Sequence, residues 1–138
     1  MPGDTRNYYE EFGGEVFFED LVSQFYARVA TNEILRPMYP EKDMKEAARR
    51  LQMFLAQYWG GPATYSEERG HPRLRMRHAG FHIDSRARDA WLLCMGEAIK
   101  GMNLSDELRV TLVGYFESAA QHMVNSDDVV TSGIDFPL

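Results

Sequence analysis

The chain has 138 residues, a net charge of −6 and 44% hydrophobic residues, which together fit one packed domain. Its single cysteine, Cys94, excludes an intramolecular disulfide and any zinc site built from several cysteines. The acidic balance argues against general nucleic-acid affinity, and no stretch reaches the ~18 apolar residues that a membrane span requires. Because no basic and then apolar leader stands at the N-terminus, we expect a cytoplasmic protein.

The first long helix is predicted between residues 14 and 32, where apolar residues recur every three or four positions. Gly13 and Gly14 would end a short helix before it. After it, two prolines predict a tight, non-helical corner over residues 36–40. The residues predicted to face inward are Phe18, Val22, Phe25, Tyr26 and Val29.

A second long helix is predicted to begin near Asp43, which suits an N-cap, and to stop at Gly60-Gly61-Pro62. Its inward residues are predicted to be Ala47, Leu51, Phe54, Leu55 and Tyr58. Residues 63–70 show no apolar period, so we expect an irregular polar loop there.

A short, arginine-rich helix is predicted over residues 72–80. Leu74 and His78 share one face of it, and Arg73 and Arg77 form a neighbouring cationic row at the same spacing. These side chains would suit an iron-containing macrocycle: the imidazole could bind the metal, the leucine could pack on the ring, and the guanidinium groups could bind its carboxylates. A solvated helix with a capping histidine has the same pattern, so this segment alone leaves both interpretations open.

Two more long helices are predicted after residue 83, the first capped by Asp84 or Ser85 and the second starting at Ser105 and running to Asn125. Their inward stripes are Ala87, Trp91, Met95, Ala98 and Met102, then Leu108, Leu112, Tyr115, Ala119 and Met123. Residues 126–138 are expected to be a mobile tail. Since no segment has a strong period of two, the predicted fold class is all-α.

Tyr26, Tyr39 and Trp91 occupy positions at which aliphatic residues would satisfy the apolar pattern equally well. Packing alone is one interpretation, because aromatic residues are common on core-facing stripes. Buried phenol and indole groups need hydrogen-bond partners, however, so three such donors close together imply an acceptor. A small ligand bound to a metal would provide one.

Six motifs spread along the chain are Phe25-Tyr26, Tyr39-Pro40 and residues 57–62, 65–67, 70–78 and 89–91. Together they closely resemble the group II truncated haemoglobins, of the bacterial O type. The resemblance implies a truncated globin fold, a two-over-two helical sandwich enclosing a b-type haem. Residues 1–125 would form this domain and residues 126–138 the tail.

By this resemblance, His78 is the proximal ligand of the haem iron, and Tyr26, Tyr39 and Trp91 hydrogen-bond the iron-bound ligand. Ala47 occupies the place where many globins have a distal histidine, and Leu51 would cover the iron. The remaining haem contacts would be Phe54, Leu74, Phe81 and Ile83, with Arg50, Arg75 and Arg77 as candidates for the propionates.

The leading functional hypothesis is a haem b protein that reversibly binds dioxygen, with carbon monoxide, nitric oxide and peroxide as further small ligands. The alternative is a haem redox enzyme that oxidises nitric oxide or turns over peroxide with a separate reductase. A third hypothesis is a haem-free interaction module that grips an anionic partner through Arg73, Arg75 and Arg77. The sequence leaves the physiological role and a possible homo-oligomer open.

Overall fold

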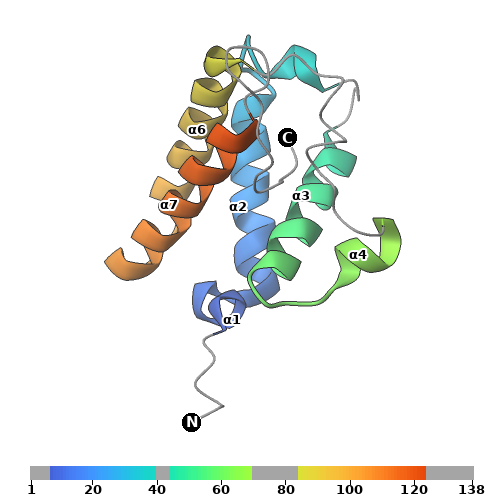
Figure 1. Cartoon of the computed structure of the whole chain (residues 1–138), viewed down its shortest axis with the longest axis vertical. Helices are drawn as coiled ribbons and strands as arrows, with labels where there is room; N and C mark the ends of the chain where they lie inside the picture. The colour runs from blue at the N-terminus through green and yellow to red at the C-terminus, as the bar shows by residue number, and fades with distance from the viewer. Residues whose placement is uncertain (1–6, 40–43, 70–83, 124–138) are drawn as a thin grey trace.

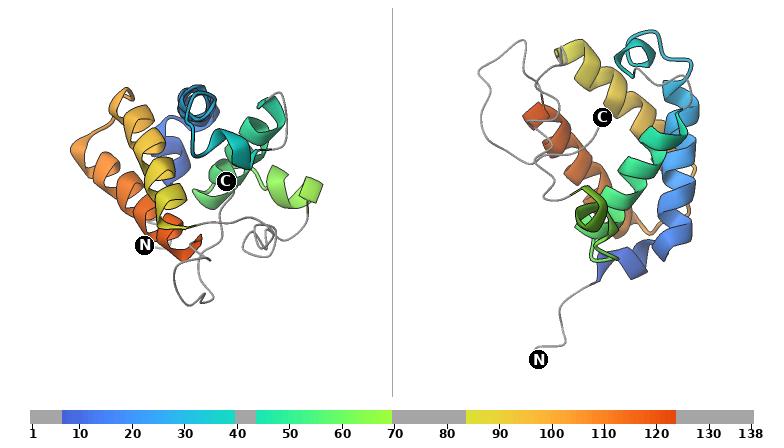
Figure 2. Two further views of the ribbon diagram at one scale, coloured as in Figure 1. Left: turned by 90° about the horizontal axis from the view of Figure 1, so that it is seen from above. Right: turned by 90° about the vertical axis from the view of Figure 1, so that its right-hand side faces the viewer.

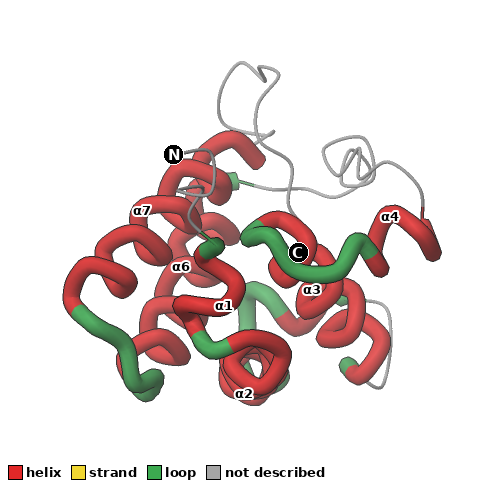
Figure 3. The backbone as a smooth tube through the Cα atoms, turned by 90° about the horizontal axis from the view of Figure 1, so that it is seen from below, coloured by secondary structure: helices red, strands yellow, loops and turns green. Residues whose placement is uncertain are grey.

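The computed structural model describes residues 7–39, 44–69 and 84–123, and the regular elements within these ranges are helices (Figure 3). None of the helices in the described ranges is long and apolar enough to cross a membrane. The predicted all-α class is therefore confirmed. The segment around His78 and the C-terminal tail lie outside the described residues.

Four long helices form two packed pairs (Figure 1). The first pair is α2 (Gly14–Val29) with α3 (Lys45–Tyr58), and the second is α6 (Ser85–Lys100) with α7 (Asp106–Met123). Helix α2 also packs against α6, so the two pairs share one core. Seen from above, α3 and α6–α7 flank α2 on opposite sides (Figure 2). This arrangement confirms the predicted two-over-two sandwich.

Three short elements complete the described fold: α1 (Tyr8–Phe12), the 3₁₀ turn η2 (Arg36–Met38) and α4 (Thr64–Arg69). Helix α1 is tied to the end of α3, because the Tyr9 N–H donates to the Trp59 carbonyl at 2.9 Å. These elements close the ends of the sandwich around its core.

Side-chain caps explain where several helices begin. The Asp84 carboxylate accepts from the Ala87 N–H at 2.9 Å, and the Ser105 hydroxyl oxygen accepts from the Leu108 N–H at 3.2 Å. Each bond satisfies a backbone donor that the first turn of a helix leaves without an internal partner. Local signals of this kind are visible in the sequence, and both predicted caps are confirmed.

The packing of α7 on α6 includes a polar link at the end of α6. The guanidinium of Arg109 donates to the carbonyls of Ile99 and Met102, at 2.8 and 3.0 Å. The Ile99 carbonyl lies in the last turn of α6 and Met102 follows the end of this helix, where carbonyl groups lack donors from within the helix. One arginine of α7 thus caps the end of α6 and links the two helices.

Residues 63–70 correct one prediction, because residues 64–69 form helix α4 instead of an irregular loop. Only Tyr65 of this segment is fully buried, so no apolar period could reveal the helix. Contacts from α3 hold it in place. The side chain of Gln57 donates to the Ser66 hydroxyl at 2.8 Å and accepts from the Ser66 N–H at 2.9 Å.

Three smaller expectations also change, and a fourth, the cap at Asp43, falls outside the described residues. Residues 36–38 of the predicted non-helical corner form a 3₁₀ turn, since Pro37 is compatible with a first helical turn. Tyr58, which the pattern predicts to face inward, is 46% exposed, although its ring contacts that of Tyr115 with centroids 4.4 Å apart. Helix α3 begins at Lys45, and the expected cap Asp43 lies outside the described residues. Helix α2 ends at Val29, a few residues earlier than expected.

Close approach of α1 to the end of α3 requires a glycine at position 61. A Cβ atom there would lie 2.6 Å from the Tyr9 ring and 2.9 Å from the Ala56 carbonyl oxygen. We expect Gly61→Ala to lower the free energy of unfolding by about 1–3 kcal/mol, the usual effect of overpacking. Chemical denaturation followed by circular dichroism measures it.

Gly96→Ala is the matched control for this prediction. Gly96 lies inside α6, and a Cβ atom there would meet nothing within 4 Å. Alanine at this position should raise the free energy of unfolding by about 0.5–1 kcal/mol, because it restricts the unfolded chain and favours the helix. If both substitutions changed the free energy of unfolding equally, close packing around Gly61 would not be the reason for a glycine at this position.

Candidate functional site

Tyr26 lies on the inward face of α2 and is buried. Its ring meets the ring of Tyr39 edge to face, with centroids 5.6 Å apart. The preceding residue, Phe25, packs against Trp91 of α6 at 4.9 Å. Adjacent residues of α2 therefore reach two other predicted site residues, from different elements of the chain.

Tyr39 is placed by the chain turn that follows α2. The Asn32 side-chain oxygen accepts from the N–H groups of Ile34 and Leu35, both at 2.9 Å, and so begins this turn. At its end, the Arg36 guanidinium donates to the Tyr39 carbonyl at 2.9 Å. With its backbone held on this side, Tyr39 turns its ring into the core and is only 5% exposed.

Trp91 stands in the second turn of α6 and is almost completely buried. Its ring packs between Phe25 of α2 and Phe116 of α7, with centroids 4.9 and 5.4 Å away. Contacts on both sides restrict the indole, because aromatic rings at these separations interlock in tilted geometries. Helices α2 and α7 thus fix the direction of the indole N–H.

The hydroxyl group of Tyr39 is the most informative atom of the site. It is buried and has no hydrogen bond of normal geometry to the rest of the described protein. Burial raises the pKa of Tyr39 well above its ordinary value, and the neighbouring Tyr26 hydroxyl raises it further. The Trp91 N–H and the Arg50 charge lower this pKa. Three predicted ligand donors and one arginine therefore converge on a single place.

Helix α3 contributes an apolar wall to the buried core that also holds these donors. Ala47, Leu51 and Phe54 recur at steps of four and three residues and are all buried, as expected. Arg50 lies on the same helix and is half-buried. The apolar residues Ala47, Leu51 and Phe54 thus belong to the same buried cluster as Tyr26, Tyr39 and Trp91.

The other predicted contacts lie in residues 70–83, outside the described residues. They are His78, Leu74, Arg75, Arg77, Phe81 and Ile83. Within the described ranges, no group of three or more histidine, cysteine, aspartate or glutamate side chains could hold a metal ion.

Two residues that support the site were missed by the sequence analysis. Phe116 is not among the residues of α7 that the pattern predicts to face inward, yet it is buried against Trp91. The apolar face of this helix is wider than the single predicted stripe. Asn32 was taken only as the limit of a helix, although it organises the turn that carries Tyr39. An asparagine just beyond a helix is a recognisable signal for such a turn, because its side chain can accept from N–H groups two and three residues later.

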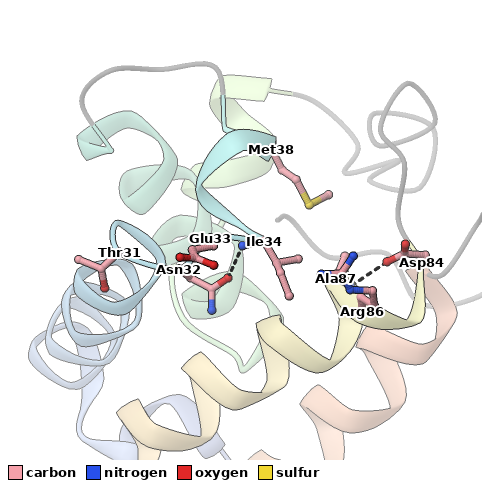
Figure 4. A pocket seen from close by; sticks show the side chains of 8 residues that line it. All are labelled: Thr31, Asn32, Glu33, Ile34, Met38, Asp84, Arg86 and Ala87. Atoms are coloured by element: carbon pink, nitrogen blue, oxygen red, sulfur yellow. Dashed lines mark hydrogen bonds between the residues drawn. The ribbon is translucent and has the colours of Figure 1, made fainter.

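A pocket of about 740 Å³ opens between η2 and the start of α6, apart from this site (Figure 4). Its polar groups serve the backbone, since Asn32 accepts from the Ile34 N–H and Asp84 accepts from the Ala87 N–H. A smaller pocket, of about 340 Å³, lies between α2 and α3 and has Tyr26 in its lining. The lining of the larger pocket is Thr31, Asn32, Glu33, Ile34, Met38, Asp84, Arg86 and Ala87.

Comparison with known proteins identifies the family of this chain. Residues 7–125 match the family of bacterial-like globins, and the chain is 44% identical to the group 2 truncated hemoglobin YjbI of Bacillus subtilis. That alignment covers 91% of this chain and 95% of its relative. The chain belongs to the group II truncated haemoglobins.

Solved structures of related proteins agree with the assignment of this chain to the truncated haemoglobins. The thermostable hemoglobin of Thermobifida fusca has a TM-score of 0.87 and 49% sequence identity, covering 89% of this chain and all of its own. The oxygen-avid haemoglobin of Bacillus subtilis has a TM-score of 0.82 and 46% identity, covering 87% and 100%. Family membership implies haem-based binding of small diatomic ligands.

Proposed function

We propose that this truncated haemoglobin holds haem b through His78 and reversibly binds dioxygen on the opposite side of the iron. The observation that supports it most directly is the buried Tyr39 hydroxyl, which lacks a hydrogen bond among the described residues. Burying such a group without a partner is unfavourable by about 1–3 kcal/mol. An iron-bound ligand between the donors would supply the missing acceptor.

The residues present fit a haem at this place. The wall formed by Ala47, Leu51 and Phe54 suits an apolar macrocycle, and the half-buried Arg50 is a candidate partner for a propionate. When bound, haem supplies an iron that takes a diatomic ligand. The chain's own residues would hold the ring, exclude water and donate hydrogen bonds to the ligand.

The donors of this chain suit dioxygen in particular. Dioxygen on ferrous iron carries partial negative charge, so N–H and O–H donors in a dry pocket stabilise it more strongly than they would in water. Tyr26, Tyr39 and Trp91 are buried to 4%, 5% and 1% exposure. The similar Bacillus subtilis protein is an oxygen-avid haemoglobin, which agrees with this proposal.

A second candidate function is redox chemistry, either the oxidation of nitric oxide to nitrate or the turnover of peroxide with an external reductase. The convergence of Tyr26 and Trp91 on Tyr39 favours it, because strong retention of oxygen hinders its delivery. Mixing the oxygen complex with nitric oxide distinguishes the two functions. Stoichiometric nitrate and repeated turnover with a reductant indicate an enzyme, whereas a single turnover indicates a binding protein.

Replacing His78 by alanine tests the proposed cofactor site. The parent protein should show a five-coordinate ferrous spectrum after dithionite reduction and a normal carbonyl complex with carbon monoxide. His78→Ala should lose the five-coordinate spectrum, since the iron loses its imidazole ligand, and added imidazole should restore it. Absorption spectroscopy measures each state.

His71→Ala is the matched control, because His71 stands in the same segment and is not a predicted ligand. Its spectra should equal those of the parent. A five-coordinate ferrous spectrum that survives in His78→Ala would contradict the assignment of this ligand, and absence of any haem signal in the parent would contradict the proposed function.

A further inference from the structure

Asn32 stands where the chain leaves α2 and turns toward Tyr39, and its backbone is bonded on both sides. The Asn32 N–H donates to the Val29 carbonyl at 3.0 Å, and the Asn32 carbonyl accepts from the Arg36 N–H at 2.9 Å. Val29 is the last residue of α2, and Arg36 is the first residue of η2. The backbone of Asn32 thus joins the helix that carries Tyr26 to the turn that leads to Tyr39.

The Asn32 side chain extends this connection to α6. Its oxygen accepts from the N–H groups of Ile34 and Leu35, both at 2.9 Å, and the bond to Ile34 is drawn in Figure 4. Because the oxygen faces these two donors, the NH₂ group lies on the opposite side of the amide. There it donates to the sulfur of Cys94 in α6 at 3.8 Å.

Cys94 is fixed in the same helix as Trp91. The two residues are three positions apart in α6, so they lie on the same side of this helix. Burial raises the pKa of the Cys94 thiol, whereas the Arg28 charge and the Asn32 amide lower it, which agrees with an N–H group directed at the sulfur. Asn32 is therefore bonded to each of the elements that carry the three predicted ligand donors.

The connection between α2 and Tyr39 depends on these polar bonds more than on apolar packing. Residues 30–38 are all described, and among them only Leu35 is fully buried. Hydrogen bonds weaken steeply when the donor no longer points at its acceptor. A small movement of this connection would therefore misdirect the Tyr39 hydroxyl without removing it from the core.

We infer that Asn32 is a positioning residue, which aligns Tyr39 with Tyr26 of α2 and Trp91 of α6 for hydrogen bonding to the iron-bound ligand. This inference rests on the proposed haem function. Asn32 acts through the three donors and not by contact with the ligand, because its side chain is engaged by the turn on one side and by Cys94 on the other.

The first test compares Asn32→Ala with the parent holoprotein. Dioxygen release from the ferrous protein should become about three to ten times faster, because the donors remain in the pocket but bind the ligand less well. The carbonyl complex gives a second measurement, since donors directed at bound carbon monoxide lower its C–O stretching frequency. Infrared spectra of Asn32→Ala should show an added band at higher frequency, which a loss of stability alone would not produce.

Two further variants separate the functions of the side chain. Asn32→Asp keeps an acceptor for the backbone N–H groups of the turn, so it should retain most of the slow release and the parent band. Cys94→Ala removes only the link to α6 and should speed release by about two to three times. Adding Cys94→Ala to Asn32→Ala should have no further effect, because the same link is already lost.

Asn7→Ala is the matched control, because the Asn7 side-chain oxygen also accepts from a backbone N–H, that of Glu10 at 3.1 Å, but at the start of α1. It should keep the release rate and the carbonyl band of the parent. Changes in Asn7→Ala equal to those in Asn32→Ala would overturn the inference, since lower stability would then explain both.

The parent release rate and band in Asn32→Ala would overturn the inference directly. If Asn32→Ala does not take up haem, Cys94→Ala decides, and parent values in that variant reject the inference. Effects of Asn32→Ala and Cys94→Ala that multiply fully in the double variant would equally reject the link to α6. Absence of a carbonyl complex in the parent rejects the proposed haem function itself, and the inference with it, so the two failures are distinguishable.

Discussion

Tyr39→Phe is expected to release bound dioxygen about ten to a hundred times faster than the parent protein, with little change in the association rate. One hydrogen bond to a charged acceptor contributes about 1.5–3 kcal/mol, which corresponds to this range of affinity. Phenylalanine keeps the ring that packs on Tyr26 at 5.6 Å and removes only the hydroxyl. The effect should therefore appear in the dissociation rate, since the donor acts after the ligand has arrived.

The same substitution should stabilise the ligand-free protein, although it weakens the binding of dioxygen. Removing a buried hydroxyl that has no partner should raise the free energy of unfolding of the ligand-free form by about 1–3 kcal/mol. Faster ligand release with unchanged or higher stability would show that the hydroxyl is placed for the ligand and not for the fold. Stopped-flow displacement by carbon monoxide and chemical denaturation measure the two quantities.

Tyr115→Phe is the matched control for both quantities, because the Tyr115 hydroxyl is also buried without a hydrogen bond among the described residues. It should raise stability in the same way and leave dioxygen release unchanged. If Tyr39→Phe released dioxygen at the rate of the parent, the Tyr39 hydroxyl would have no role in ligand binding.

Phe18→Ala should lower the free energy of unfolding by about 3–5 kcal/mol, the usual cost of removing a large aromatic side chain from a core. Phe18 is fully buried in α2. Its ring centroid lies 5.1 Å from Phe17, 5.7 Å from Tyr9 and 6.0 Å from Phe12. This aromatic cluster joins α1 to α2, so its loss leaves a cavity that rings held by other helices cannot fill.

Val16→Ala provides the control, since Val16 lies in the same helix and is 77% exposed. It should change stability by less than about 0.5 kcal/mol, as surface substitutions usually do. Denaturant titration of both variants in the haem-free and haem-bound forms gives the comparison. A Phe18→Ala variant as stable as Val16→Ala would mean that the cluster does not hold α1 on α2.

Local patterns in the sequence were sufficient to predict the four long helices and most of their inward faces. Apolar periodicity marks a helix because it must bury one stripe, and caps such as Asp84 and Ser105 mark its beginning through bonds within one turn. These features depend on neighbours a few residues away. The family was predicted for the same reason, since its motifs are short segments that are read directly. His78 and its neighbours in residues 70–83 stay predictions.

Burial and convergence of side chains were decided by the tertiary structure. The pattern of α3 predicts that Tyr58 faces inward, but the structure leaves this side chain 46% exposed, with one face of its ring against Tyr115 of α7. Helix α4 forms without a periodic signal because Gln57 of α3 binds Ser66. Tyr39 meets Tyr26 and Trp91 only after the turn at Asn32 and the packing of α6 bring them together. Such contacts join residues far apart along the chain, so their energies depend on how the helices assemble and not on local sequence.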